Sequence, residues 1–205
     1  IDYLVYPFSR GRIFNTIEKD VGQYEKKKKI FWASGTAFLT RQKIFKNIGG
    51  FDESLFAHME EIDYHWKCLL NKYDIYIIPK SIIYHKGGET LSYGSHKKIY
   101  LNHRNSIILF LTNHNYLSLS MILKRLLLEK LAALYYLFTG QFKGFFAVCR
   151  ANIWILLKLS YIRKRRIKIK KIIKKDYVIP KELMAPYSIV LQYFKNNKKT
   201  YKELN

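Results

Sequence analysis

Apolar positions in the second half of the chain follow the three- and four-residue spacing of α-helices. This spacing predicts three helices, over residues 97–111, 116–138 and 141–159. The breaks between them are polar or contain glycine, as expected where helices end. The chain from residue 97 to residue 159 is therefore expected to be mainly helical.

The first half contains shorter elements. A short helix is predicted over residues 41–48, before the breaker Gly49-Gly50, and an amphipathic helix over 59–71. Apolar and β-branched runs beside turn residues predict short strands, at 30–32, 37–39, 75–78 and 82–84. Residues 1–29 are typical of a loop with short helical pieces. These elements predict an α/β fold that is followed by helices.

The charge of the chain is large and uneven. The 205 residues carry 37 Lys plus Arg against 15 Asp plus Glu, a formal charge of +22, while 49% of residues are hydrophobic. That hydrophobic content excludes a disordered polyelectrolyte. Residues 1–100 hold a net charge of +5 and residues 101–205 hold +17. The second half is therefore expected to bind an anionic partner, either lipid headgroups or nucleic acid.

The pattern of the helical half predicts a membrane interface rather than a membrane crossing. The most apolar uncharged stretch, residues 131–142, has 12 residues, whereas a bilayer crossing needs about 20. Large apolar side chains alternate with cations before a basic block at 161–175, which holds nine Lys or Arg. Helices of this kind lie in the headgroup plane. The alternative is a helical core element with a solvated basic tail.

Neither the cysteines nor the chain start indicates secretion. Cys68 and Cys149 lack the spacing of a zinc site or a redox pair, so we expect reduced thiols in a cytosolic setting. The chain starts at Ile1 without a signal-peptide pattern, which suggests a piece of a longer protein.

Several candidate functional residues lie in the helix predicted over 59–71 or in the segments that flank it. Glu60, Glu61 and Asp63 open this helix, beside its apolar stripe rather than on it, and their spacing fits either helix capping or catalysis. His85 follows an expected strand and precedes Gly87-Gly88, a common position for metal ligands and acid/base groups. Ser34-Gly35 lacks the pattern of a nucleophile elbow, which disfavours a serine hydrolase.

The order of these pieces resembles a known enzyme family. Residues 31–88 look like the C-terminal half of a family 2 glycosyltransferase catalytic domain, of the inverting GT-A fold. Four motifs carry the resemblance: W-x-S-G at 32–35, G-G-F-D-E at 49–53, E-E-x-D-x-x-W-K at 60–67, and P-x-x-x-x-x-H at 79–85. The similarity extends over residues 1 to about 115, and the basic helices are similar to those of bacterial members that act on lipid-linked acceptors.

The resemblance implies a role for each matching residue. Glu61 stands where these enzymes place the catalytic base, usually an Asp. Glu60 and Asp63 would orient the base or the acceptor, and Trp32 and Gly35 would line the acceptor side. His85 would help to hold a divalent metal, Mn²⁺ or Mg²⁺, on the donor diphosphate. The implied partners are a nucleotide-sugar donor and a lipid-linked glycan or surface polysaccharide precursor.

One departure from the family pattern concerns the donor side. The family's nucleotide-binding strands and metal-binding Asp-x-Asp pair have no counterpart before Ile30. We therefore expect an acceptor-side fragment with the donor half missing, peripheral at the cytoplasmic face of the inner membrane. The expected organisation is 1–115 for the partial catalytic domain, 116–175 for membrane-associated helices and 176–205 for a polar tail. The alternative is a non-catalytic basic membrane-docking or scaffold domain. Nucleic-acid binding ranks last, because the aromatic residues lie mostly in apolar runs.

Overall fold

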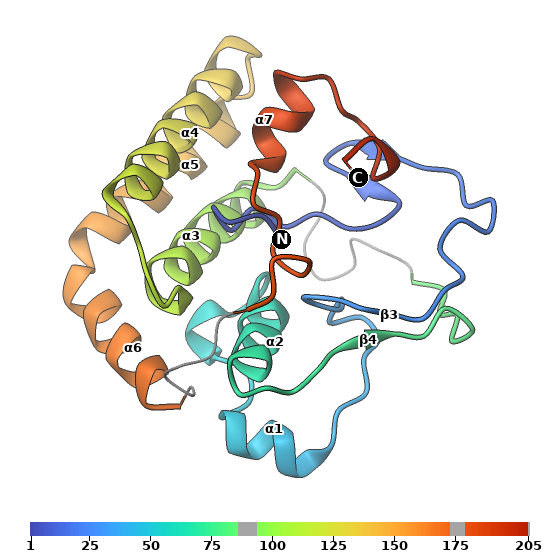
Figure 1. Cartoon of the computed structure of the whole chain (residues 1–205). Coiled ribbons are helices and arrows are strands. Elements are labelled where there is room, and N and C mark those ends of the chain that lie inside the picture. Colours follow the sequence, from blue (N-terminus) through green and yellow to red (C-terminus); the bar gives the residue numbers. More distant parts are fainter. Residues whose placement is uncertain (86–93, 173–178, 205) are drawn as a thin grey trace.

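The fold is a mixed α/β arrangement in which helices predominate (Figure 1). The computed structural model describes residues 1–85, 94–172 and 179–204. Within these ranges the chain forms seven α-helices, two 3₁₀ helices and two small antiparallel sheets. The expected α/β class is thus confirmed at this coarse level.

Each of the two sheets consists of two strands, and each strand has two residues. β1 (Arg12–Ile13) pairs with β2 (Thr16–Ile17), and β3 (Lys28–Lys29) pairs with β4 (Tyr76–Ile77). Apart from β4, which falls within 75–78, the strand predictions are wrong, because 30–32, 37–39 and 82–84 form no strand. The helical pieces expected within 1–29 are also not found. Short apolar runs favour an extended backbone, but a strand also needs a neighbouring partner.

The helices predicted over 41–48, 59–71, 97–111, 116–138 and 141–159 are confirmed, and further helices are present. They are α1 (Gln42–Ile48), η1 (Glu53–Leu55), α2 (Glu60–Leu70), α3 (His96–Asn113), α4 (Leu119–Phe138), α5 (Phe142–Leu157), α6 (Leu159–Ile172), α7 (Ile189–Phe194) and η2 (Lys202–Leu204). Ser95, Ser118 and Ser188 cap α3, α4 and α7 by accepting a hydrogen bond from a backbone N–H in the first turn. The long helices therefore begin at signals that the sequence carries locally.

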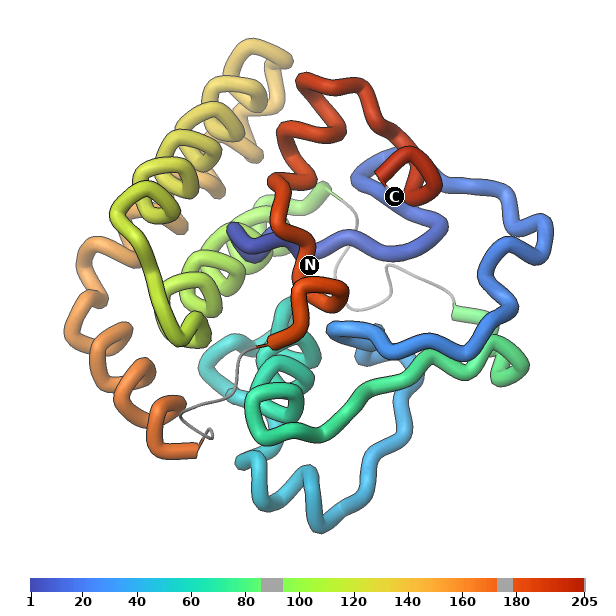
Figure 2. The backbone as a smooth tube through the Cα atoms, viewed as in Figure 1, coloured from blue at the N-terminus to red at the C-terminus, as the bar shows by residue number. Residues whose placement is uncertain are grey.

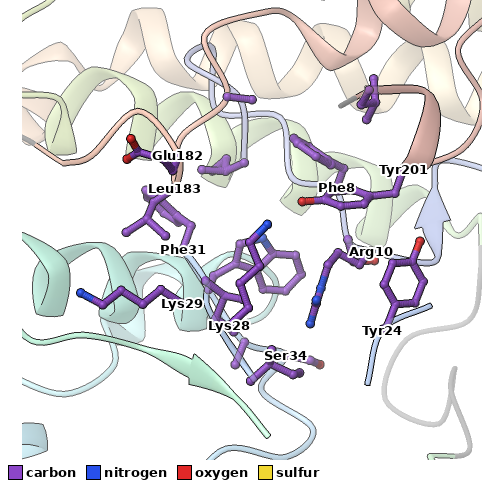
Figure 3. Close-up of a pocket in the computed structure, with 18 of the residues that line it drawn as sticks. Phe8, Arg10, Tyr24, Lys28, Lys29, Phe31, Ser34, Glu182, Leu183 and Tyr201 are labelled. Carbon is purple, nitrogen blue, oxygen red and sulfur yellow. The ribbon is translucent and has the colours of Figure 1, made fainter. Parts of the chain in front are cut away.

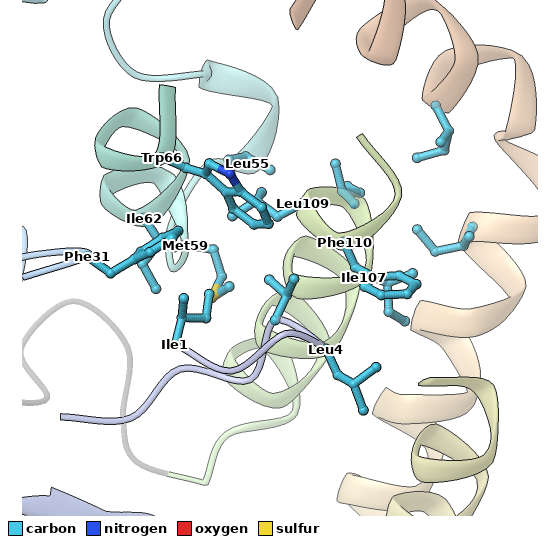
Figure 4. Close-up of a cluster of buried hydrophobic side chains, with 14 of the residues drawn as sticks. Ile1, Leu4, Phe31, Leu55, Met59, Ile62, Trp66, Ile107, Leu109 and Phe110 are labelled. Atoms are coloured by element: carbon cyan, nitrogen blue, oxygen red, sulfur yellow. The ribbon is translucent and has the colours of Figure 1, made fainter. Parts of the chain in front are cut away.

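The main hydrophobic core lies between α2, α3 and the N-terminal segment. Trp66 of α2 and Ile108 of α3 are at most 1% exposed, and Leu4 and Val5 of the N-terminal segment belong to the same buried cluster. Figure 4 shows Trp66 and Leu4 on different sides of α3. Phe31 enters the same core and packs edge-on against Trp66, with ring centroids 5.4 Å apart. Burying side chains of this size contributes roughly 1.5–3 kcal/mol each. This core fixes α2, which carries the candidate catalytic residues.

Helices α4 and α5 form an outer layer next to α3 (Figure 1). Gly144 of α5 faces Tyr136 of α4 so closely that an added Cβ would lie 2.4 Å from the ring. The outward face of this layer carries large exposed apolar side chains, among them Leu119, Leu123, Leu127, Leu131, Phe138, Phe142, Phe146, Ile153 and Leu157. Among the described residues, no single helix is long and apolar enough to cross a membrane. The pair α5 and α6 meets those criteria only jointly, with a bend of 74°.

The C-terminal segment folds back onto the beginning of the chain (Figure 2). Asp2 accepts a hydrogen bond from the backbone N–H of Ile189 at 2.9 Å, and Tyr3 N–H donates to the carbonyl of Ala185 at the same distance. Ile13 and Ile189 form a second small core. Residues 179–204 are therefore a packed part of the fold, in contrast to the polar tail that we expected. The apolar positions that pack here are too few to form a periodic pattern.

Candidate active site

A strained loop leads into the candidate catalytic helix. Phe56, His58 and Met59 have positive φ angles of 62°, 66° and 74°, although none of them is glycine. Such conformations cost on the order of 1–3 kcal/mol each and persist only where surrounding contacts hold them. The backbone just before Glu60 is therefore held by the rest of the fold.

Two polar residues of α3 hold this loop in place. Asn105 is fully buried, and its Nδ2 lies 2.8 Å from the carbonyl of Leu55 and 2.7 Å from that of His58. Arg104 Nη2 donates to the carbonyls of Ser54 and Leu55 at 3.0 and 3.2 Å. These hydrogen bonds offset the backbone strain and fix the first turn of α2. The sequence reasoning missed both residues, although an Arg-Asn pair inside an apolar helical pattern was a visible signal.

Glu60 and Glu61 form a carboxyl pair in the first turn of α2. Burial, the negative charge of Glu60 and a hydrogen bond between the two carboxyls raise the pKa of Glu61 from 4.5 to about 7. Burial also raises the pKa of Glu60. A general base works best when its pKa lies near the working pH, so Glu61 has the electrostatics of such a group. Perturbed carboxyl groups of this kind concentrate at functional sites.

Several buried polar atoms around this pair have no hydrogen-bond partner. They are His58 Nε2, Glu60 Oε2, Glu61 Oε2 and His65 Nδ1. Burial lowers the pKa of His65 to about 4, so this imidazole is neutral at pH 7. Buried polar groups are almost always hydrogen-bonded, and a cluster of unpaired atoms is suited to bind a polar ligand. A hydroxyl group is a matching ligand, because it can both donate to a carboxylate and accept from an imidazole N–H.

The turn that contains Gly35 covers Glu61. A Cβ built on Gly35 would lie 3.8 Å from the Cβ of Glu61, and a hydrogen bond from the Gly35 backbone favours the ionised carboxylate. Thr36 Oγ1 in this turn lies 3.4 Å from Nδ1 of His85, which is exposed. Trp32 packs against the main core. The structure thus brings Gly35, Glu61 and His85 to one turn, with Trp32 close to it in the chain.

The position of Asp63 differs from our expectation. We expected this residue beside the buried face of α2, but it is fully buried. Its Oδ1 accepts hydrogen bonds of 2.7 Å from Arg165 and from Asn113, and its Oδ2 lies 3.0 Å from Nζ of Lys67. Burial opposes ionisation, but Arg165 and Lys67 outweigh it and hold the pKa of Asp63 below its ordinary value. Asp63 therefore faces away from the carboxyl pair and anchors α6.

Arg165 links the basic helix α6 to this network. Its guanidinium donates to Asp52 at 2.9 Å and to Asp63 at 2.7 Å, and it also contacts Thr112 and Asn113 of α3. Two carboxylates and two uncharged groups thus surround one buried cation. The block 161–175 contains nine basic residues, and no local pattern indicates that Arg165 is the structural one.

A large pocket with both polar and apolar walls lies beside the turn at Gly35 (Figure 3). Its volume is about 760 Å³, within the usual range of ligand pockets. Trp32, Ser34 and Ala37 form the edge that it shares with the turn. The other walls come from the N-terminal segment, from β3 and from residues 181–204, with the aromatic side chains Phe8, Tyr24, Tyr187 and Tyr201.

The pocket has an excess of positive charge. Its lining contains four cations and two carboxylates: Arg10, Lys28, Lys29, Lys181, Asp20 and Glu182. Figure 3 shows Arg10 and Lys28 above Ser34, with Tyr24 beside Arg10, whose guanidinium carbon lies 5.4 Å from the ring centroid. Lys29 is also paired with Asp74 at 2.7 Å. Cations and aromatic rings together suit an anionic ligand that also carries flat or apolar faces.

The described residues do not form a metal site by themselves. In the parts of the chain that the structure describes, no group of three or more His, Cys, Asp or Glu side chains is placed to hold a metal ion. His85 approaches Thr36 rather than a carboxylate. The expected Mn²⁺ or Mg²⁺ thus has one candidate protein ligand here, and the other ligands would have to come from outside the described residues.

Comparisons with protein-family models, with curated proteins and with solved structures give no match to this chain. The resemblance to family 2 glycosyltransferases therefore rests on the motifs of residues 31–88. The geometry adds one independent point, because the turn that contains Gly35 covers Glu61 and also approaches His85, although the three residues are distant in sequence.

Proposed function

We propose that this chain forms the acceptor and base side of an inverting glycosyltransferase that acts on a lipid-linked glycan or surface polysaccharide precursor. The observation that carries the proposal is the Glu60–Glu61 pair, with the Glu61 pKa raised to about 7 beneath the turn of Gly35. The same turn borders a cationic pocket that is large enough for a sugar phosphate. The motif resemblance supplies the reaction class.

In the proposed reaction, Glu61 accepts the proton of the attacking acceptor hydroxyl. The acceptor oxygen forms a bond to the anomeric carbon from the face opposite the leaving group, and the bond from that carbon to the diphosphate oxygen breaks. The nucleoside diphosphate leaves with the electron pair of that bond. Inversion at the sugar follows from this single displacement. Burial and the charge of Glu60 keep the pKa of Glu61 high, and the Gly35 backbone donates a hydrogen bond to its carboxylate.

The test uses the full-length gene product that contains this chain. Release of nucleoside diphosphate is measured with UDP-glucose, UDP-N-acetylglucosamine, GDP-mannose and dTDP-rhamnose, with Mn²⁺ and a polyprenyl-diphosphate-linked sugar as acceptor. Glu61→Gln should lower kcat about 10² to 10⁴-fold with little change in donor KM. The matched control is Glu53→Gln, an exposed glutamate outside the pair. Unchanged turnover in Glu61→Gln would remove this residue from the role of base.

We further propose that the protein binds peripherally to the cytoplasmic face of the inner membrane. The exposed apolar face of α4 and α5 is the observation in favour, together with exposed cations of α6 such as Arg163, Lys164, Lys168 and Lys170. Each cation near an anionic surface contributes about 1 kcal/mol. This association is also compatible with the rival reading, a non-catalytic docking domain.

Vesicle co-sedimentation tests the membrane proposal. Replacing Arg163, Lys164, Lys168 and Lys170 with Gln should strongly reduce binding to vesicles that contain phosphatidylglycerol, and added salt should do the same. This variant is preferable to deletion of the basic block, because deletion would also remove the buried Arg165. Equal binding to neutral and anionic vesicles, or binding to neither, would contradict the proposal.

A further inference from the structure

Helix α6 contacts the chain on both sides of the Glu60–Glu61 pair. Before the pair, Arg165 Nε donates to the carboxylate of Asp52 at 2.9 Å. After the pair, Arg165 Nη2 donates to Asp63 at 2.7 Å. The donors of a guanidinium point in fixed directions in one plane, so a single Arg side chain holds both carboxylates in a defined relative position. The segment that carries the pair is thereby closed across α6.

A second side chain of α6 reaches the same segment. Tyr161 lies about one helical turn before Arg165, and its hydroxyl is 2.6 Å from Oγ of Ser54. The backbone N–H of Ser54 donates in turn to Oδ1 of Asp52 at 3.0 Å, which caps the 3₁₀ helix η1. Helix α6 therefore holds η1 through two side chains, one at its capping residue and one inside it.

The backbone between these contacts is the strained loop that leads into α2. Phe56, His58 and Met59 have positive φ angles, and such residues keep this conformation only where surrounding contacts hold them. The backbone N–H of Asp63 donates to the carbonyl of Met59 at 2.9 Å and so closes the first turn of α2. Loss of the contacts from α6 would free both ends of this segment. The first turn of α2 would then open to water.

The carboxyl pair reports on this closure. Burial is the largest cause of the raised pKa of Glu61, so exposure to water should lower this pKa toward its ordinary value. The two imidazoles of the same site are already neutral at pH 7, because burial lowers the pKa of His65 to about 4 and burial with the charge of Lys98 lowers that of His58. Neither imidazole changes its charge in the range where Glu61 titrates in the closed site.

We propose that α6 is a positioning element of the candidate active site, in which Arg165 and Tyr161 clamp residues 52–63 and keep the Glu60–Glu61 pair closed and correctly oriented. The role of Glu61 as a base rests on the proposed function, whereas the clamp is a property of the fold and can be tested without activity. Through this clamp, a helix about one hundred residues further along the chain determines the surroundings of the pair.

The neighbouring Arg166 provides a matched control. It also attaches α6 to the fold, because its guanidinium donates to the carbonyl of Leu111 at 2.7 Å and to that of Asn115 at 3.5 Å. Among the described residues, its hydrogen bonds do not reach residues 52–63. A variant of Arg166 therefore loosens α6 without touching the clamp.

The test is a carboxyl ¹³C NMR titration of the 205-residue chain labelled at glutamate, in which the Glu61 signal is identified by its loss in Glu61→Gln. Arg165→Lys keeps the charge, but a single ammonium cannot bind both carboxylates in the fixed geometry of the guanidinium. It should lower the titration midpoint of Glu61 by about one pH unit. Tyr161→Phe, which removes only the bond to Ser54, should lower it by about 0.3 unit. Arg166→Lys should leave it unchanged.

Activity of the full-length protein provides a separate readout. Arg165→Lys should lower kcat about tenfold at unchanged donor KM, and the acid limb of its kcat profile should move with the NMR midpoint. If Glu61→Gln stays active, the proposed function fails, but the midpoints still decide on the clamp. The clamp is overturned if neither Arg165→Lys nor Tyr161→Phe lowers the midpoint, or if Arg166→Lys lowers it as much. If Arg165→Lys does not fold, Tyr161→Phe decides alone.

Discussion

The carboxyl pair at the start of α2 should make the protein less stable as the pH rises, and Glu61→Gln should relieve this effect. The folded protein binds the Glu61 proton more tightly than the unfolded chain does, with a pKa of about 7 against 4.5. Below pH 4.5 the carboxyl is protonated in both states, and it does not lower the free energy of unfolding. Between pH 4.5 and 7 only the unfolded chain loses the proton, so the free energy of unfolding falls. Above pH 7 the carboxyl is ionised in both states, and the free energy of unfolding stays lowered by the full amount.

The pKa difference sets the size of this effect. It corresponds to at most about 3 kcal/mol, and the partial exposure of Glu61 reduces the figure, so we expect about 1–3 kcal/mol. Glu61→Gln keeps the shape of the side chain but cannot ionise. At pH 8 it should therefore raise the free energy of unfolding by about 1–3 kcal/mol, while at pH 4 it should change little.

Urea unfolding at half-unit steps from pH 4 to pH 8, followed by tryptophan fluorescence, measures this difference. Glu53→Gln is the matched control, since this glutamate is exposed, and its unfolding should shift little at any pH. The prediction is wrong if Glu61→Gln is as stable as the parent protein at pH 8, or less stable. A variant that is more stable but inactive in the full-length protein would show that the pair is kept for function at the expense of stability.

Three further predictions concern the packing and the metal. Arg165→Leu leaves the buried carboxylate of Asp63 and the partly exposed one of Asp52 without this cation, so we expect a loss of about 3–5 kcal/mol in the free energy of unfolding. Arg163→Leu, at an exposed site on the same helix, should cost less than about 0.5 kcal/mol, and equal losses in urea unfolding would contradict this. Gly144→Ala places a Cβ against the Tyr136 ring and should lower the free energy of unfolding by about 1–3 kcal/mol. The double variant with Tyr136→Leu should recover part of this loss. Thermal unfolding of the two single variants and the double variant tests this, and no recovery would argue against the contact. Titration calorimetry of the 205-residue chain with Mn²⁺ and UDP-glucose should show no saturable binding below millimolar concentration, because the described residues offer one candidate metal ligand, His85. Tight stoichiometric binding would contradict the prediction and point to a donor site within this chain, such as the cationic pocket.

The sequence by itself determined the helical half and the helix that carries the candidate base. Apolar spacing and capping serines are local signals, and the bounds of α3, α4 and α5 follow them within a few residues. The spacing of the apolar residues likewise predicted α2 with Glu60 and Glu61 in its first turn. These features need no information about distant parts of the chain, because an amphipathic helix is specified within about a dozen residues.

Only the tertiary structure decided which polar residues are structural and which are available to a ligand. Asp63 lies two residues from Glu61, yet it is fully paired with Arg165 from a helix about one hundred residues away. Arg165 lies in the same run of basic residues as the exposed Arg163, two positions earlier. The same applies to Asn105, whose role depends on three carbonyl groups of a distant loop. A spacing rule cannot distinguish such residues, because the cost of burying a charge depends on the partners that the fold supplies.

The pocket and the short strands also depend on contacts between distant segments. The cationic pocket exists because residues 181–204 fold back beside the N-terminal segment, which no local pattern in that polar stretch indicated. The strand predictions at 30–32 and 82–84 were wrong for the same reason. Phe31 enters the core, and Ile82, Ile83 and Tyr84 remain exposed. An extended segment becomes a strand only when another segment lies in register beside it. A charged surface becomes a pocket only when another segment covers it. Both placements depend on the packing of the whole chain.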